Sequence, residues 1–175
     1  MIFREVEDAD LIRQARRGDI DAYNALIARW EKRVYNYLLK LVGDREDALD
    51  LAQEVFLKAW QALRKLDDVE RFSPWLFRIA HNEAYSLLRR SRPQREVEDQ
   101  PAGEGYQRLY PAEWSLAVRR ALDSLTAEQR EAVVLKVYEG FKFEEMAAIL
   151  DEPVSTVKSR LYTALERLKE VLMPA

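Results

Sequence analysis

The last helical segment of the chain carries a concentration of basic side chains. Residues 155–169, STVKSRLYTALERLK, contain one acidic residue and four basic ones, Lys158, Arg160, Arg167 and Lys169. Lysine and arginine bind phosphate and guanine, and serine and threonine hydroxyls adapt to more than one base. These residues could therefore bind nucleic acid. The alternative is a solvated helix face, the usual meaning of a charged run, and the rest of the sequence must decide between the two.

A second basic stretch lies in the middle of the chain. Residues 78–95 contain five arginines and one glutamate, and Phe72 and Trp75 precede them. Unstacked bases bind to aromatic side chains beside a positive groove, so this combination suits single-stranded nucleic acid. The net charge of the whole chain is only −3. Local basic patches, and not net charge, make the electrostatic footprint for nucleic acid.

The residue types that catalysis or metal binding requires are sparse. The chain has no cysteine and one histidine, which excludes disulfides and thiolate metal sites. No glycine-rich phosphate loop, metal-ligand cluster or nucleophile–base pair appears. We therefore expect no cofactor, no metal and no enzymatic activity, which disfavours a helical nucleotide-processing enzyme.

Composition limits the class of protein. A chain of 175 residues with 48% hydrophobic and 34% charged residues suits one large globular domain or two small ones. No apolar run approaches the ~18 residues of a membrane span. The start of the sequence is acidic rather than signal-like. We expect a soluble cytoplasmic protein with no membrane insertion.

Helical periodicity runs through the first half of the chain, and capping residues set the expected boundaries. A short helix is expected over residues 8–17. Asp19 is the expected N-cap of a long helix that ends at Gly43, and a third helix begins near Asp44.

A fourth helix is expected after the loop KLDDVE. Ser73 followed by Pro74 predicts an N-cap and a first-turn proline, and the helix should end near residue 90. Its expected core-facing residues are Phe72, Trp75, Leu76, Ile79 and Ala80.

Residues 93–113 interrupt this periodicity with three prolines, two glycines and an acidic surplus. Such a composition predicts a flexible linker between an N-terminal domain, 1–92, and a C-terminal domain, 114–175. The expected fold class is all-α, with two helical domains joined by the linker.

The C-terminal domain contains a candidate helix-turn-helix. LTAEQ predicts a capping box in which Thr126 is the N-cap and Gln129 reaches back, and Gly140 should end that helix. The segments FEEMAAIL and STVKSRLYTALERLKEVL, joined by DEPV, have helix-turn-helix spacing, with Ser155 as N-cap. Spacing alone leaves an ordinary helical hairpin equally open, and Pro153 in the turn favours the helix-turn-helix modestly.

The last helix has a distinct apolar stripe. The residues expected to pack inward are Val157, Leu161, Ala164, Leu165, Leu168 and Leu172. Those expected to point outward are Thr156, Ser159, Arg160 and Thr163, with Lys158 and Tyr162 flanking them. A recognition helix places its N-terminal outward residues against base edges in the major groove.

Three segments together resemble one protein family. LTAEQREAVVLKVYEGFKFEEMAAILDEPVSTVKSRLYTALERLK resembles the C-terminal DNA-binding domain of the extracytoplasmic-function (ECF) sigma factors of bacterial RNA polymerase. DREDALDLAQEVFLKAW and FSPWLFRIAHNEAYSLLRR resemble the two hallmark segments of the family's N-terminal domain. The three occur in family order and cover nearly the whole chain. The resemblance implies a protein that binds core RNA polymerase and directs promoter recognition and transcription initiation.

The resemblance also implies two DNA-binding regions. The C-terminal domain would read the −35 element through Ser155, Thr156, Lys158, Ser159, Arg160, Thr163 and Arg167. The N-terminal domain would bind and melt the −10 element through Lys65, Arg71, Phe72, Arg78, Asn82, Arg89 and Arg90. A flipped base would enter the loop of residues 65–71. His81 stands where the family commonly has a basic residue, so we expect it at the surface or facing DNA.

Three residues depart from the family pattern in the C-terminal domain. Lys142 stands where a serine or threonine cap is usual, which weakens that helix start. Asp151 replaces the usual turn glycine, and aspartate tolerates the left-handed conformation better than most residues. Thr163 stands where a base-reading arginine is common, so specificity for the −35 element should differ.

Polymerase binding is implied for the third helix. Its expected contacts with the clamp coiled coil of core RNA polymerase are Asp47, Asp50, Gln53 and Glu54. The carboxylates share an outward face that a basic partner helix would complement, although a solvated acidic face is the simpler meaning of this pattern alone. Leu49 stands where the family usually has an acidic residue, which puts one polar contact in doubt.

The expected partners follow from the same resemblance. They are core RNA polymerase, promoter DNA and an anti-sigma factor, and the free protein is expected to be a monomer. The alternative is a helix-turn-helix transcriptional regulator that acts without joining the polymerase, in which case the N-terminal domain would sense a signal or dimerise.

Overall fold

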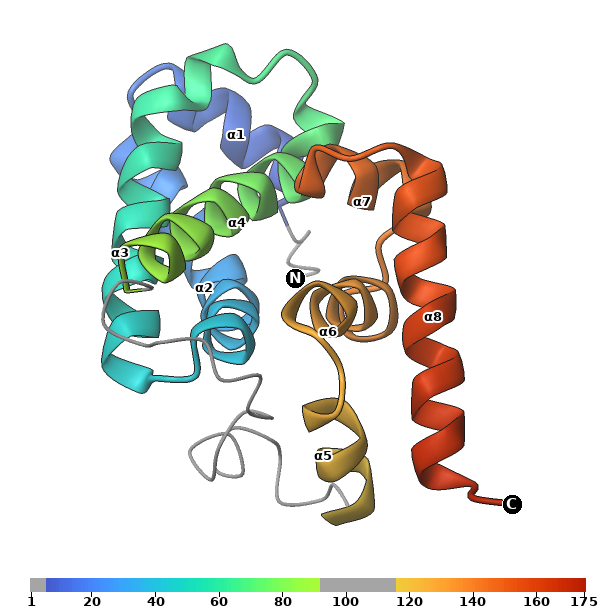
Figure 1. Ribbon diagram of the computed structural model, residues 1–175. Helices are drawn as coiled ribbons and strands as arrows, with labels where there is room; N and C mark the ends of the chain where they lie inside the picture. Colours follow the sequence, from blue (N-terminus) through green and yellow to red (C-terminus); the bar gives the residue numbers. More distant parts are fainter. Residues whose placement is uncertain (1–5, 92–115) are drawn as a thin grey trace, which may run out of the picture.

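The computed structural model describes residues 6–91 and 116–175, and this part of the chain folds into helices without a strand (Figure 1). The N-terminal helices are α1 (Asp8–Arg16), α2 (Ile20–Val42), α3 (Arg45–Ala62) and α4 (Phe72–Ser91). The C-terminal helices are α5 (Leu116–Asp123), α6 (Ala127–Val133), α7 (Phe143–Leu150) and α8 (Val154–Leu172). The expectation of an all-α fold with two helical domains is confirmed. The predicted linker, 93–113, and the predicted domain boundary at 114 lie outside the described residues.

Capping chemistry places the first helices where the sequence predicts them. The carboxylate of Asp19 accepts a hydrogen bond from the Ala22 backbone at 3.1 Å and begins α2. Gly43 ends that helix with a φ of 76°, a left-handed conformation that glycine adopts without steric cost. Asp44 then caps α3 by accepting from the backbone N–H of Asp47 at 2.9 Å.

The start of α4 differs from the prediction. The helix begins at Phe72, so Ser73 is not its N-cap, while Pro74 lies within the first turn as predicted. Two 3₁₀ turns, η1 (Leu63–Lys65) and η2 (Val69–Arg71), occupy the expected loop. Asp68 caps η2, which runs directly into α4. Proline is tolerated there because the first N–H groups of a helix have no intrahelical partner.

The N-terminal domain packs α2, α3 and α4 around one apolar core. Tyr37, Leu76 and Phe77 are fully buried in it. Tyr23 packs on Trp60, with ring centroids 4.8 Å apart, and its hydroxyl donates to the backbone carbonyl of Phe56 across the α2–α3 interface. These contacts of Tyr23 hold α2 and α3 together.

The C-terminal domain contains the predicted helix-turn-helix. Thr126 and Gln129 form the expected capping box at the start of α6. The helix continues as one π turn, η5 (Val134–Tyr138), and ends before Gly140, whose φ is 70°. The turn between α7 and α8 is made by Asp151, which has a φ of 52°, so the left-handed aspartate that the sequence predicts is confirmed.

Two predictions about α8 require correction. Ser155 is not the N-cap of α8, because Pro153 is the extended residue before the helix and Ser155 lies in the first turn. Leu165 and Leu172 are 41% and 42% exposed, whereas Leu168 between them packs against the core, so the covered part of the stripe is narrower than the apolar stripe itself. Val157, Leu161 and Ala164 are buried as expected. A lysine side chain cannot accept a hydrogen bond, so Lys142 cannot cap α7 with its side chain. The start of α7 is supported instead by the Glu145 carboxylate, which accepts a hydrogen bond from the backbone N–H of Lys142.

The two domains are in contact. Helices α4 and α7 lie side by side, and α2 meets α6 (Figure 1). Among the described residues, no helix has the length and apolar character to cross a membrane.

Candidate nucleic-acid interface

Helix α8 presents the predicted base-reading side chains to solvent. Val157, Leu161 and Ala164 anchor one face of the helix in the domain core. Lys158, Ser159 and Thr163 project from the other face and are exposed. Ser155 is also exposed, and Thr156 is half-buried. A helix held rigidly on one side with small polar and cationic groups on the other has the form of a recognition helix.

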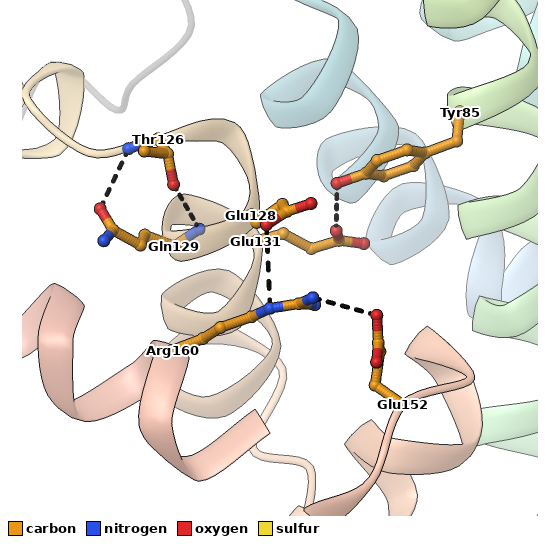
Figure 2. Close-up of polar contacts among 7 residues, drawn as sticks. All are labelled: Tyr85, Thr126, Glu128, Gln129, Glu131, Glu152 and Arg160. Atoms are coloured by element: carbon orange, nitrogen blue, oxygen red, sulfur yellow. Dashed lines mark hydrogen bonds and ion pairs between the residues drawn. The ribbon is translucent and has the colours of Figure 1, made fainter. Parts of the chain in front are cut away.

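The position of Arg160 differs from the prediction that it points freely outward. Its guanidinium lies 3.0 Å from the Glu152 carboxylate and 3.8 Å from that of Glu128, and its side chain is 23% exposed (Figure 2). Arg160 therefore joins α8 to α6 and to the turn, as well as lying close to the outward face. Arg167 is more exposed and lies 3.6 Å from Glu170.

The predicted −10 residues divide into two groups. Lys65, Arg71, Asn82, Arg89 and Arg90 are exposed. Phe72 is 3% exposed and packs against the rings of Trp30 and Trp75, so its assignment as a DNA contact is corrected to a core residue. Ile79 and Trp75 are partly buried against the same core.

Arg78 is in contact with the C-terminal domain. Its guanidinium donates to the backbone carbonyl of Ala148 at 2.7 Å and lies 3.7 Å from the Asp151 carboxylate. The side chain is 40% exposed. In this arrangement Arg78 binds the helix-turn-helix and is only partly open to a phosphate.

His81 contradicts the expectation of a surface position. Its side chain is 15% exposed, and Nδ1 lies 2.6 Å from Oε1 of Glu131. Glu131 is 2% exposed and also accepts from the Tyr37 hydroxyl at 2.6 Å. Its other oxygen accepts from the Tyr85 hydroxyl at 2.7 Å (Figure 2). Burial, with the nearby charge of Glu131, raises the pKa values of both Tyr37 and Tyr85 well above the ordinary range, so both stay protonated donors.

Sequence reasoning missed this cluster of Glu131, Tyr37, His81 and Tyr85. Nothing in the local sequence links Tyr37 to Glu131, which is 94 residues away. The one available signal is that Glu131 directly precedes the apolar run of residues 132–135, because a buried carboxylate requires hydrogen-bond donors.

The predicted polymerase contacts lie on two sides of α3. Asp47, Asp50 and Glu54 face a polar groove between α3 and α4, which Arg89 and Arg90 also line. Gln53 faces the opposite groove, between α2 and α3. That groove is apolar and is lined by Ile20, Tyr23, Ile27, Leu49, Phe56, Leu57 and Trp60, among other residues. Leu49 and Leu57 are 53% and 52% exposed at its edge.

Metal chemistry has no visible support in the described part of the chain. Nowhere in residues 6–91 and 116–175 do three histidine or carboxylate side chains come together as a metal site requires.

Comparison with known proteins identifies the family of the chain. Residues 26–94 match the family Sigma-70 region 2, and residues 115–168 match Sigma-70, region 4. The RNA polymerase sigma-H factor of Pseudomonas aeruginosa is 31% identical, over 96% of this chain and 95% of that protein. The ECF RNA polymerase sigma-E factor of Escherichia coli K12 is 30% identical, over 97% and 96% of the two chains.

Two solved structures are similar over most of their length. CnrH, in complex with the cytosolic domain of CnrY, has a TM-score of 0.72 and 30% identity, covering 94% of this chain and 96% of that chain. The sigma factor RpoE of Bartonella quintana, in complex with the anti-sigma factor NepR, has a TM-score of 0.70 and 29% identity, covering 87% and 97%. A match to both sigma regions favours a polymerase subunit over a regulator that acts alone. The chain belongs to the ECF sigma factors, the alternative sigma factors with which RNA polymerase recognises promoters.

Proposed function

We propose that α8 reads the −35 element in the major groove, while α4 and the preceding turns bind the −10 element. The observation that carries this proposal is the exposed polar face of α8. Lys158, Ser159 and Thr163 project from a helix whose other face is buried, so they can approach base edges without disturbing the fold. The first turn of α8 also supplies backbone N–H groups to phosphate.

The surface for the −10 element combines the turn region with the outward side of α4. Lys65 and Arg71 lie exposed in η1 and η2, and Asn82 is exposed on α4. Cationic side chains beside an amide suit an unpaired strand, because the backbone meets positive charge while a base edge meets hydrogen-bonding groups. Arg89 and Arg90 extend the positive charge along the helix.

Transcription in vitro with core polymerase on randomised promoters tests this assignment. Lys158→Ala and Thr163→Ala should alter the ranking of −35 sequences, and each lost base contact should cost on the order of 1–3 kcal/mol. Lys169→Ala is the matched control, since it removes an exposed lysine near the far end of the same helix. An unchanged ranking in both test variants would refute base reading by α8.

The polymerase contact is proposed for α3, with the coiled-coil clamp as partner. Two surfaces of this helix support it. The acidic side carries Asp47, Asp50 and Glu54, and the other side carries Gln53 beside the exposed Leu49 and Leu57. An amphipathic helix of the clamp could place apolar side chains in the groove and basic ones toward the carboxylates.

The location of the protein, its role without catalysis and its anti-sigma partner are inferred from the family. We infer that the protein acts in the cytoplasm as a DNA-recognition subunit without its own catalysis. An anti-sigma partner is supported by the relatives CnrH and RpoE, whose structures are complexes with the cytosolic domain of CnrY and with the anti-sigma factor NepR. Co-purification of the chain with candidate partners, in competition with core polymerase, tests this.

A further inference from the structure

The contact between the two domains is organised around one buried carboxylate. Glu131 belongs to α6, and its three hydrogen-bond partners, Tyr37, His81 and Tyr85, belong to α2 and α4 of the other domain. Both carboxylate oxygens are used, since Oε1 meets Tyr37 and His81 and Oε2 meets Tyr85. A side chain of the C-terminal domain is therefore solvated by the N-terminal domain instead of by water.

In the surrounding contacts, too, the N-terminal domain supplies the positive or hydrogen-bond-donating side chain. Arg33 of α2 lies 2.9 Å from the Glu139 carboxylate, and Lys40 lies 4.4 Å from the centroid of the Tyr138 ring. On the other side, the N-terminal domain contributes Arg78, which meets the carbonyl of Ala148 and the carboxylate of Asp151. The N-terminal domain supplies cations and donors along this interface, and the C-terminal domain supplies carboxylates and a carbonyl.

The interface is mixed, because Phe77 of α4 packs on Phe141 of the C-terminal domain with ring centroids 5.1 Å apart. Its polar part can open more easily than an apolar core. Burying a carboxylate costs several kcal/mol, and that cost is recovered only if its hydrogen bonds are complete. When the domains separate, water can solvate the carboxylate, both tyrosine hydroxyls and the imidazole. Opening therefore leaves few of these polar groups without a hydrogen-bond partner. Closing requires that the donors return to accurate hydrogen-bond geometry around the Glu131 carboxylate.

The closed arrangement brings the two candidate DNA-binding surfaces close together. Arg78 of the −10 surface lies 3.7 Å from Asp151, four residues before Ser155 of the −35 surface. Four residues span at most about 14 Å of chain. The two promoter elements are nominally 25 base pairs apart, which is about 85 Å of duplex at 3.4 Å per base pair. The closed form cannot contact both elements at once.

We propose that Glu131, Tyr37, His81 and Tyr85 form a clasp that holds the free sigma factor closed and must open before both promoter elements can be bound. The inference rests on the proposed division of the −10 and −35 elements between the two domains. The closed arrangement also occupies part of the −10 surface, because Arg78 binds the C-terminal end of α7. In helix-turn-helix proteins the first helix of the motif, here α7, crosses the DNA backbone.

Energy transfer between two dyes on the full chain tests the clasp. The chain has no cysteine, so Gln61→Cys on α3 and Lys169→Cys on α8, both at exposed positions, provide unique labelling sites in the two domains. Glu131→Ala should lower transfer, and the ratio of closed to open molecules should fall by at least about tenfold, because hydrogen bonds to a charged group are lost. Glu144→Ala, which removes an exposed glutamate of the same domain, should leave transfer unchanged.

A second variant removes the ambiguity of a misfolded mutant. Tyr85→Phe deletes one donor from the opposite domain and should also lower transfer, and the double variant with Glu131→Ala should add little to Glu131→Ala alone. Wild-type transfer in both single variants would overturn the clasp. So would undiminished transfer when the labelled wild type binds core polymerase on a promoter. If the wild type never supported transcription, the proposed function would fail while the response to Glu131→Ala still reported on the clasp.

Discussion

Reversing the acidic side of α3 should impair both polymerase binding and stability. Asp50 and Glu54 are four residues apart and neighbour each other on the helix surface. The change Asp50→Arg with Glu54→Arg would place two cations in the polar groove that Lys58, Arg89 and Arg90 already line. A basic clamp helix would meet positive charge instead of negative, and its association should weaken sharply.

The groove determines the size of the effect on stability. An isolated surface change would stay within about ±0.5 kcal/mol. Here each substitution removes an attraction of about 0.2–1 kcal/mol and adds a repulsion of similar size, which gives a total of roughly 1–4 kcal/mol for the pair. At about 4–8 °C per kcal/mol for a domain of this size, the melting temperature of the N-terminal domain should fall by roughly 4–30 °C. Sequence spacing alone predicts almost no loss.

A neutral pair of substitutions separates the two effects. Asp50→Asn with Glu54→Gln removes the attraction without adding repulsion, so it should cost less than about 1–2 kcal/mol and still weaken polymerase binding. Thermal melting and co-purification with core polymerase are measured on each variant, and Glu144→Arg on the other domain is a control that changes the net charge by as much as the neutral pair does. Undiminished co-purification in both double variants would refute the acidic contact, and an unshifted melting temperature in the arginine pair would refute the electrostatic coupling across the groove.

Three further changes have distinct expected results. Leu57→Glu, at the exposed edge of the apolar groove, should leave melting nearly unchanged but abolish co-purification with core polymerase, and normal binding would exclude this groove from the interface. Arg160→Ala should lower the free energy of unfolding of the C-terminal domain by about 1 kcal/mol in urea titrations, because its ion pairs tie α8 to Glu128 and Glu152. Unchanged stability with uniformly weaker DNA binding would instead make Arg160 a phosphate contact alone. Tyr23→Phe should cost about 1–3 kcal/mol, since the buried carbonyl of Phe56 loses its donor, and a calorimetric scan showing no change would mean that water or a shifted backbone satisfies that carbonyl.

The local signals in the sequence were sufficient to predict most helix boundaries. Asp19, Gly43 and Asp44 determine theirs through side-chain caps and a left-handed glycine, which depend on a few adjacent residues. The α4 start was mispredicted because a capped 3₁₀ turn replaces the cap expected at Ser73. The exposure of Leu165 could not be predicted, since an apolar stripe indicates the side that can be buried but not how far a neighbouring helix covers it.

The sequence alone also identified the family and the outward residues of α8, because helical periodicity assigns faces and the ordered motifs are specific. Tertiary structure alone decided which of the side chains expected to face DNA are open to it and which are bound within the protein. His81 and Arg78 were expected to face DNA, yet they contact Glu131 and Asp151 from the other domain. The physical reason is that a buried carboxylate takes whatever donors the packing brings within hydrogen-bond distance, and residues 46 to 94 positions away are brought there by the fold and not by local sequence.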